Sequence, residues 1–228
     1  TLLLCTLGIM VGLFTVTGFI NRMGGMLLKV GEFHIIALVL MAWLFGWLVG
    51  TGLPPTAPYI VLAVIVVDPM RKMGVDPWIA HFFCFLIAVW GELSPPTSLA
   101  AAVSARIAEA SFVKTMWTAL QLCLPVTLMT FAIFVRSELV VKPGWKQIED
   151  TLIVAIACGG VAFALFGRML STRKWDVMLR TALAFLSLVV MLHPNDHVAL
   201  GAAVVVMLAT FYGTYRHRLI CREKRAPA

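Results

Sequence analysis

Charged residues are scarce in this sequence. Only 13% of its 228 residues are Asp, Glu, Lys or Arg, whereas 61% are hydrophobic, and the mean hydropathy is +0.96. A typical soluble domain carries about 25% charged residues, so this composition excludes one. Polar stretches that could form a separate soluble domain are also lacking, because apolar runs of membrane-spanning length recur along the whole chain. The sequence therefore predicts an all-α, polytopic membrane protein.

Catalytic and metal-binding motifs are absent as well. The sequence has no H-E-x-x-H motif, no pair of aspartates within its apolar runs and no Ser/His pair at a shared depth, so we do not expect an enzyme. Its five cysteines lack C-x-x-C or other metal-ligand spacing, and buried thiols are the simplest interpretation. No cofactor is predicted.

The net charge of +7 does not indicate a nucleic-acid partner, because the basic residues are spread over short loops. The densest basic run, residues 215–225, directly follows an apolar segment. Such a juxtamembrane tail is typical of the cytoplasmic side and of contact with anionic lipid in the bilayer.

The sequence begins inside an apolar run, without Met or a charged segment followed by a cleavage site. We therefore expect no signal peptide and interpret the chain as part of a longer protein. Residues 1–20 predict one spanning helix. Residues 35–67 are too many for one crossing at about 1.5 Å per residue and too few for two with a loop, so they predict a discontinuous helix.

Two Pro-Pro-Thr triplets interrupt strongly apolar stretches, at residues 54–56 and 95–97. Backbone in hydrocarbon has no water to bond to, so an irregular stretch must be buried in protein or line a cavity. The simpler alternative is that the prolines only kink helices. Because there are two similar triplets, each preceded by glycine at a discontinuity, we favour binding sites.

The second triplet lies between two short apolar arms, about 79–90 and 97–110, which predict a re-entrant hairpin over residues 79–110. A single spanning helix kinked at Pro95 is the alternative. We predict a core of residues 1–140, including a span at 115–135. An extension of about three apolar helices with a basic tail occupies residues 141–228.

Proline supplies no N–H, so each triplet removes the helical donor for two carbonyls four residues earlier. Neighbouring hydroxyls add further oxygens, and neutral oxygen clusters suit a small hard cation such as sodium. The helix that restarts after each triplet points N–H groups and its positive dipole end at the break, which favours an anion. The predicted ion-binding residues are Gly50, Thr51, Gly52, Thr56, Gly91, Glu92, Ser94 and Thr97. The predicted substrate-binding or helix-break residues are Pro54, Pro55, Pro95, Pro96 and Ser98.

Glu92 is an outlier, because a carboxylate at membrane depth costs about 2.5–3.5 kcal/mol on insertion scales. We interpret it as a residue of ion or proton coupling or of hairpin-tip orientation, with a structural hydrogen-bonding role as the alternative. Arg106 lies too far along the second arm to be an obvious partner. His81 is interpreted as a packing or capping residue, and the tryptophans as interfacial anchors.

The residues around both triplets resemble the large membrane subunit of tripartite ATP-independent periplasmic (TRAP) transporters, of the fused-permease subfamily. The break G-[MT]-G-L-P-T-T-A-A-Y is similar to residues 50–59, GTGLPPTAPY, and the hairpin tip S-x-[IL]-T-P-P-x-[AS]-L to residues 91–99, GELSPPTSL. Pro55, Pro58 and Ser94 depart from the family pattern, at positions where Thr, Ala and Thr are usual. The resemblance covers roughly residues 1–140.

The resemblance implies the second inverted repeat of an elevator-type permease in the bacterial inner membrane. It implies that a periplasmic binding protein delivers an organic anion, commonly a carboxylate, and that a sodium or proton gradient drives symport. The first repeat and a small four-helix portion would be further partners, so we expect no transport by this chain alone. A channel or structural scaffold is the alternative function.

Overall fold

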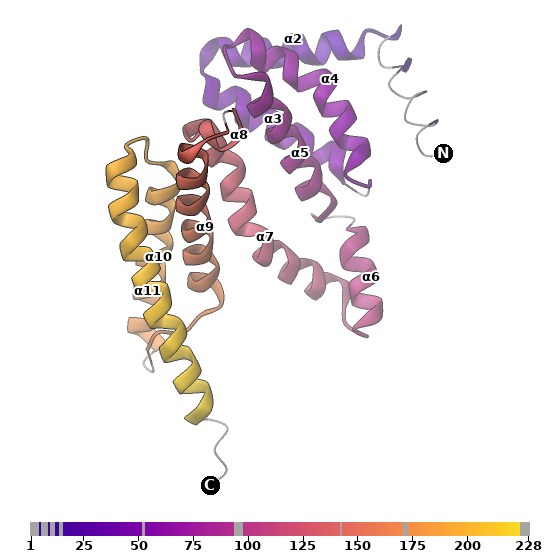
Figure 1. The fold of residues 1–228 in the computed structure, drawn as a ribbon. Coiled ribbons are helices and arrows are strands. Elements are labelled where there is room, and N and C mark those ends of the chain that lie inside the picture. Colours follow the sequence, from indigo (N-terminus) through magenta and orange to yellow (C-terminus); the bar gives the residue numbers. More distant parts are fainter. Residues whose placement is uncertain are drawn as a thin grey trace. The chain divides into compact units, whose positions relative to one another are not determined.

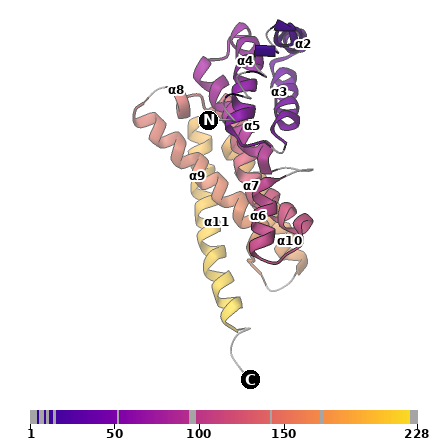
Figure 2. The same ribbon diagram turned by 90° about the vertical axis from the view of Figure 1, so that its right-hand side faces the viewer.

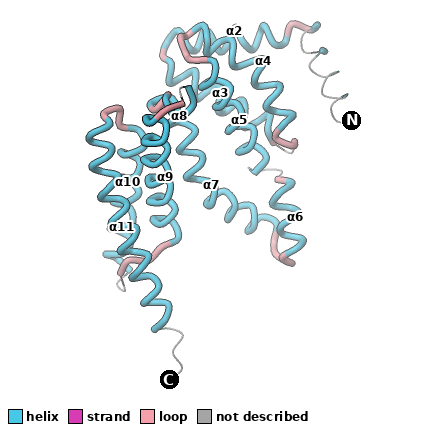
Figure 3. Tube along the Cα trace, in the orientation of Figure 1, coloured by secondary structure: helices cyan, strands magenta, loops and turns pink. Residues whose placement is uncertain are grey.

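The computed structural model describes residues 5, 9, 12–13, 16–51, 53–93, 98–141, 143–170 and 173–223. Within these ranges the chain forms α-helices joined by short loops, with no strand (Figure 3). It divides into two compact units, Thr1–Leu120 (unit 1) and Gln121–Ala228 (unit 2). The prediction of an all-α protein is confirmed, while the span predicted over residues 1–20 lies largely outside the described residues.

Unit 1 is built on three helices that pack against one another (Figure 1). They are α3 (Ile35–Gly50), α4 (Thr56–Lys72) and α5 (Pro77–Leu93). A further helix, α2 (Phe19–Phe33), which the sequence analysis did not anticipate, packs on α3 and α4. The short helix α6 (Leu99–Ile107) follows α5.

The ends of these helices follow from local chemistry. His34 caps α3, because its Nδ1 accepts a hydrogen bond of 3.1 Å from the Ile36 N–H. Asp76 accepts from the Trp78 N–H at 2.8 Å, and Pro77 is a favourable first helical residue because it lacks an N–H. After α4, Gly74 adopts φ +86°, the left-handed conformation that ends helices and that glycine tolerates best. These caps fix where α3, α4 and α5 begin or stop.

The segment predicted as one discontinuous helix is divided as its prolines require. Helix α3 ends at Gly50, Thr51 is extended (φ −62°, ψ 120°), and α4 begins at Thr56. The irregular stretch is therefore only five residues long, 51–55.

The second triplet separates α5 from α6, but these helices do not pack side by side. Helix α5 is longer than the predicted arm, 17 residues, and α6 has nine. In Figures 1 and 2, α6 lies beyond the C-terminal end of α5, and the two share few contacts. This arrangement resembles the alternative, one helix interrupted at Pro95. The re-entrant hairpin is not confirmed and stays a prediction.

Unit 2 contains the long, uninterrupted helices. Helix α7 (Phe112–Val135) begins in unit 1 and continues into unit 2, where α8 (Glu138–Val141) follows. Three helices then lie side by side: α9 (Trp145–Phe166), α10 (Arg173–Leu192) and α11 (Asp196–Glu223) (Figure 1). Among the described residues, α7, α9, α10 and residues 196–216 of α11 are long and apolar enough to cross a membrane.

The helices of unit 2 extend beyond the apolar runs because their polar ends are paired. Arg136, at the end of α7, is buried and forms an ion pair with the buried Asp150 on α9. It also contacts Asp196 at 3.4 Å and donates to the His193 carbonyl at 3.3 Å. Lys146 bonds to the same Asp196 at 3.2 Å. This cluster ties α7, α9 and α11 together at one end of the unit.

Candidate functional site at two helix breaks

The C-terminal ends of α3 and α5, each next to a Pro-Pro triplet, meet at a glycine–glycine contact in unit 1. Gly50 is the last residue of α3, Gly91 lies in the last turn of α5, and both are buried. A Cβ on Gly50 would stand 2.8 Å from the Gly91 Cα, and a Cβ on Gly91 would stand 2.7 Å from the Gly50 Cα. Any side chain would therefore collide with backbone. The structure brings together two of the predicted site residues that are 41 positions apart.

This contact continues along α3 as a stripe of small residues. Gly46 precedes Gly50 by one turn, and a Cβ there would meet Ile87 at 2.5 Å and Leu62 at 3.1 Å. Small residues spaced by four let membrane helices approach closely. The close approach of α3 to α5 is what places the first break beside the end of α5.

At the first break, one of the two carbonyl oxygens predicted to lack a hydrogen-bond donor already accepts a hydrogen bond. The Gly50 carbonyl accepts a long hydrogen bond of 3.4 Å from the Leu53 N–H, so the prediction that this oxygen is unpaired is wrong. The chain turns tightly before Pro54, so the N–H of Leu53, three residues after Gly50, reaches this oxygen. The Thr51 carbonyl has no hydrogen bond with any described residue. The Thr51 hydroxyl donates to the Leu48 carbonyl at 2.8 Å, which leaves its oxygen able to accept or to bind a cation.

The helix that restarts at the first break keeps one N–H available, that of Thr56, because Pro58 has no N–H and the Tyr59 N–H donates to the Pro55 carbonyl at 3.1 Å. No side chain caps the N-terminus of α4, whose preceding residue is Pro55, although the Pro54 carbonyl accepts from the Ala57 N–H at 3.0 Å. Thr56, the first helical residue, is exposed. The free Thr56 N–H and the positive end of the helix dipole attract negative charge.

At the second break, the described residue is Ser98. Its hydroxyl caps α6 by accepting from the Ala101 N–H at 3.1 Å, and the residue is buried. A capping role thus accounts for this hydroxyl. Gly52, Ser94, Pro95, Pro96 and Thr97 lie outside the described residues, so their predicted roles stay predictions.

Glu92 lies beside the glycine contact, in the last turn of α5, and is half-buried. It makes no hydrogen bond or ion pair with any residue that the structure describes. Arg106 is exposed in the last turn of α6 and does not pair with it, as predicted. The carboxylate therefore remains available to a ligand, or to a group outside the described part of the chain.

Three tryptophans pack around the same helix pair, which the sequence analysis missed. The ring centroids of Trp43 and Trp90 are 4.8 Å apart, and Trp47 lies 5.7 Å from Trp90. Trp47 keeps a buried indole N–H without a hydrogen bond to any described residue. The spacing of Trp43 and Trp47, one helical turn, was the available signal, because such residues share a helix face.

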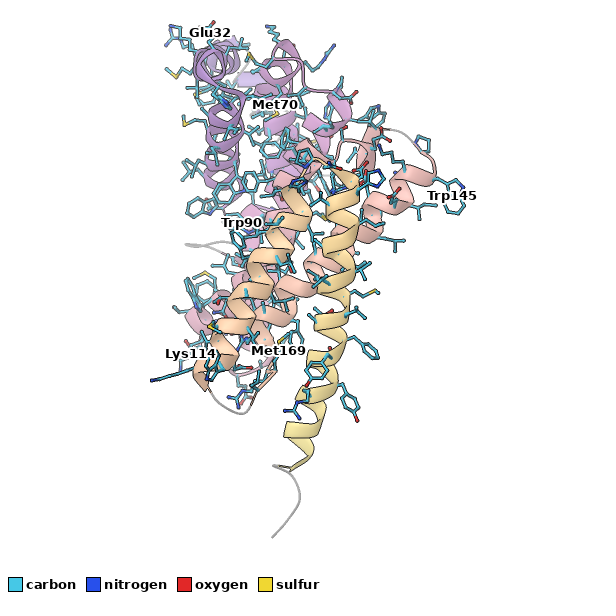
Figure 4. All side chains as sticks on the ribbon, turned by 90° about the vertical axis from the view of Figure 1, so that its left-hand side faces the viewer. Glu32, Met70, Trp90, Lys114, Trp145 and Met169 are labelled. Atoms are coloured by element: carbon cyan, nitrogen blue, oxygen red, sulfur yellow. The ribbon has the colours of Figure 1, made fainter. Side chains whose placement is uncertain are left out.

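Other tryptophans fit the predicted anchoring role better. Trp145, at the start of α9, is 85% exposed and projects away from its helix in Figure 4, where Trp90 is also labelled. Trp78 and Trp175 are likewise exposed near the starts of their helices. A position near a helix end therefore does not tell whether a tryptophan is an interfacial anchor or a member of an aromatic cluster.

His81 packs between helices, as predicted. Its Nδ1 lies 3.2 Å from the Tyr59 hydroxyl, so this pair joins α5 to α4 one helical turn after the first break. The Tyr59 ring also meets Phe85 edge to face at 6.4 Å between centroids. These contacts hold the first turn of α4, which begins at Thr56 next to the break.

The chemistry available at the breaks is that of neutral oxygens with one carboxylate. The described residues hold no group of three or more His, Cys, Asp or Glu side chains that could bind a metal ion. A cation here would be held by carbonyls, hydroxyls and at most Glu92. Such ligands match a hard, weakly held cation such as sodium better than a transition metal.

The described helices, several of them long and apolar enough to cross a membrane, define the class of molecule, a polytopic helical membrane protein. Residues 1–139 match the sequence model of the family described as "Tripartite ATP-independent periplasmic transporter, DctM component". The chain belongs to this family, whose members are membrane components of TRAP transporters. No curated protein and no solved structure matches the chain. Residues 140–228 lie outside the family match.

Proposed function

We propose that this chain supplies part of the membrane pathway of a binding-protein-dependent secondary transporter, which takes up an organic anion of the carboxylate class by symport with sodium or protons. Membership of the DctM family supports the transport role. The observation that supports the ion site is the contact between Gly50 and Gly91, which lie a few residues before the two Pro-Pro triplets. Broken helices whose carbonyls hold a cation and whose N-termini face an anion are the usual construction of such sites.

The proposed site has two parts. The Thr51 carbonyl and hydroxyl, with Glu92 and the undescribed residues 94–97, bind the coupling ion. The N-terminus of α4 at Thr56 binds the anion. The first repeat, the small membrane portion and a periplasmic binding protein complete the transporter in the bacterial inner membrane. In the complete permease, residues 79–110 form the re-entrant hairpin of an elevator domain.

The test is uptake into proteoliposomes that hold the complete permease, with its binding protein outside. We expect saturable uptake that needs both the binding protein and an inward sodium or proton gradient. Thr51→Val keeps the side-chain shape but removes the hydroxyl, and should raise the ion concentration needed for half-maximal uptake about tenfold, since a hydrogen bond to a charged group is worth about 1.5–3 kcal/mol. Thr115→Val, at a half-buried residue of α7 whose hydroxyl also donates to a backbone carbonyl, is the matched control.

Other outcomes would reject parts of the proposal. Passive ion conductance without the binding protein would identify a channel instead. Glu92→Gln with unchanged uptake and unchanged pH dependence would remove Glu92 from the coupling site. An equal effect of Thr51→Val and Thr115→Val would show that the first break does not hold the ion.

A further inference from the structure

Unit 2 contains an apolar cavity that the transport site does not use. It has a volume of about 290 Å³ and is lined by residues of α7, α9 and α10. All lining side chains except Arg180 and Thr181 are apolar, among them Leu124, Val161 and Leu188. The cavity lies within helices that are long and apolar enough to cross a membrane. A polar solute would find almost no partner along it.

Arg180 places one charged group at this cavity. Its Nε donates to the Ala164 carbonyl at 2.7 Å and its Nη2 to the Leu165 carbonyl, which fixes the guanidinium at the end of α9. A guanidinium has five N–H donors, and these two hydrogen bonds use two of them. Nη1 forms an ion pair with the Asp176 carboxylate at 3.6 Å, a separation too long for a hydrogen bond. The Arg180 side chain is 23% exposed, so donors remain available to a ligand.

The surroundings of Arg180 are basic. Arg168, just after α9, and Lys174, in the first turn of α10, are both exposed at this end of unit 2. The one described acidic residue between them and Arg180 is Asp176, whose carboxylate also accepts from the Met169 and Leu170 N–H groups at 2.6 and 2.9 Å. The balance at the cavity's charged end is therefore positive.

The length of the cavity matches a lipid chain. Along α10 it is lined from Val177 to Leu188, which is roughly 16 Å at helical rise. One leaflet of a bilayer contributes about half of a 30 Å hydrocarbon core. A groove of leaflet length with cations at one end fits an amphiphile with one acyl chain in the groove and an anionic group beside Arg180.

We propose that the α7–α9–α10 cavity of unit 2 binds an anionic phospholipid, with one acyl chain between Leu124 and Leu188 and the phosphate at Arg180. Charge complementarity selects an anionic headgroup, and the apolar lining selects a lipid over a free phosphate ion. The site is separate from the helix breaks of unit 1 and does not depend on the transport proposal.

The test is a lipid titration of the whole chain, purified in a mild detergent and observed by native mass spectrometry. Phosphatidylglycerol and phosphatidylcholine with identical acyl chains are the two probes. We expect phosphatidylglycerol to bind about fivefold more tightly, because one cation near the membrane surface contributes that preference. High salt should reduce the preference. Equal binding of the two lipids at low salt would overturn the proposal.

Two pairs of variants separate the groove from the headgroup site. Ala184→Phe fills the groove and should weaken phosphatidylglycerol binding at least fivefold, whereas Ala182→Phe, at an exposed residue of α10 outside the lining, should not. Arg180→Gln should abolish the preference for the anionic lipid, while Lys146→Gln, at the opposite end of unit 2, should retain it.

Arg180 also caps α9, so the helix content of Arg180→Gln is checked by circular dichroism. A variant with native helix content that keeps the lipid preference would overturn the headgroup assignment. If Arg180→Gln does not fold, the variants Ala184→Phe and Ala182→Phe test the proposal. Equal binding of phosphatidylglycerol by these two variants would show that the lipid does not occupy the groove.

Discussion

The two units of this protein bury polar groups in different ways. Among the described residues, the one buried polar side chain in unit 1 is Ser98, which caps a helix. Unit 2 buries the charged side chains of Arg136, Asp150 and Asp176, all of which are paired. Unit 1 instead interrupts its helices at prolines, so that its polar groups near the core are backbone carbonyls and hydroxyls.

The two ways of burying polar groups suit two different functions, a fixed structure and reversible ion binding. A buried ion pair satisfies its charges permanently, so it suits a fixed structure and leaves nothing for a mobile ion. Neutral oxygens at a broken helix are incompletely satisfied and can bind a cation and release it. The family match covers the unit with the breaks and ends at residue 139, just after Arg136. This difference supports the proposal that ion and substrate chemistry lies in unit 1 and that unit 2 has a supporting role.

The largest expected effect comes from breaking the ion pair of unit 2. Arg136→Met leaves the Asp150 carboxylate buried without its partner, and removing one member of a buried pair costs about 3–5 kcal/mol. Thermal unfolding of the purified chain in detergent, followed by circular dichroism, should show a large fall in the midpoint for α9–α11.

The control for this prediction is Lys146→Met, which removes the exposed member of the same cluster. Exposed ion pairs contribute little, so its midpoint should stay close to that of the parent. A double variant, Arg136→Met with Asp150→Leu, should recover much of the loss, because it leaves no unpaired charge. Equal midpoints for Arg136→Met and Lys146→Met would show that burial does not distinguish the two units.

The sequence predicts the breaks of unit 1 better than the pairs of unit 2. Proline removes an N–H wherever it stands, so the end of α3 at Gly50 and the start of α4 at Thr56 follow from residues 50–56 alone. The partners of Arg136 are 14 and 60 residues away, and which carboxylate it meets depends on how the helices pack. Nothing local to Arg136 indicates burial.

In the candidate site, too, local features could be predicted from the sequence, whereas contacts between helices could not. The sequence identified Gly50 and Gly91 as residues next to helix breaks, but not that they touch, because the contact depends on the crossing of α3 and α5. The direction of α6 could not be predicted for a related reason. Apolar arms of this length fit both a hairpin and an interrupted helix, and packing decides between them.

A medium effect is expected at the glycine contact. Gly91→Ala places a Cβ 2.7 Å from the Gly50 Cα, where the neighbouring atom is backbone and cannot move aside as a side chain would. Overpacking of this kind costs about 1–3 kcal/mol, and the displaced breaks should lower ion-driven uptake further. The measurements are the unfolding midpoint of the chain and uptake by the complete permease.

Gly25→Ala is the control, because Gly25 lies in α2 with nothing within 4 Å of the added methyl group. Alanine there should stabilise the helix by up to about 1 kcal/mol. If Gly91→Ala were as well tolerated as Gly25→Ala, the close approach of α3 to α5 would not be required in unit 1.

The smallest effect is expected for Tyr59→Phe. This change keeps the edge-to-face contact with Phe85 but removes the hydroxyl that lies 3.2 Å from His81 Nδ1. One hydrogen bond contributes about 0.5–1.5 kcal/mol, so the unfolding midpoint should fall only slightly. Uptake should respond more than stability, because the pair holds the start of α4, where the proposed anion site lies. Tyr212→Phe, at an exposed tyrosine of α11, should change neither quantity. A loss of uptake in Tyr59→Phe with an unchanged midpoint would show that the Tyr59–His81 pair supports the site of unit 1. A loss of stability without a loss of uptake would show that the pair only links α4 to α5.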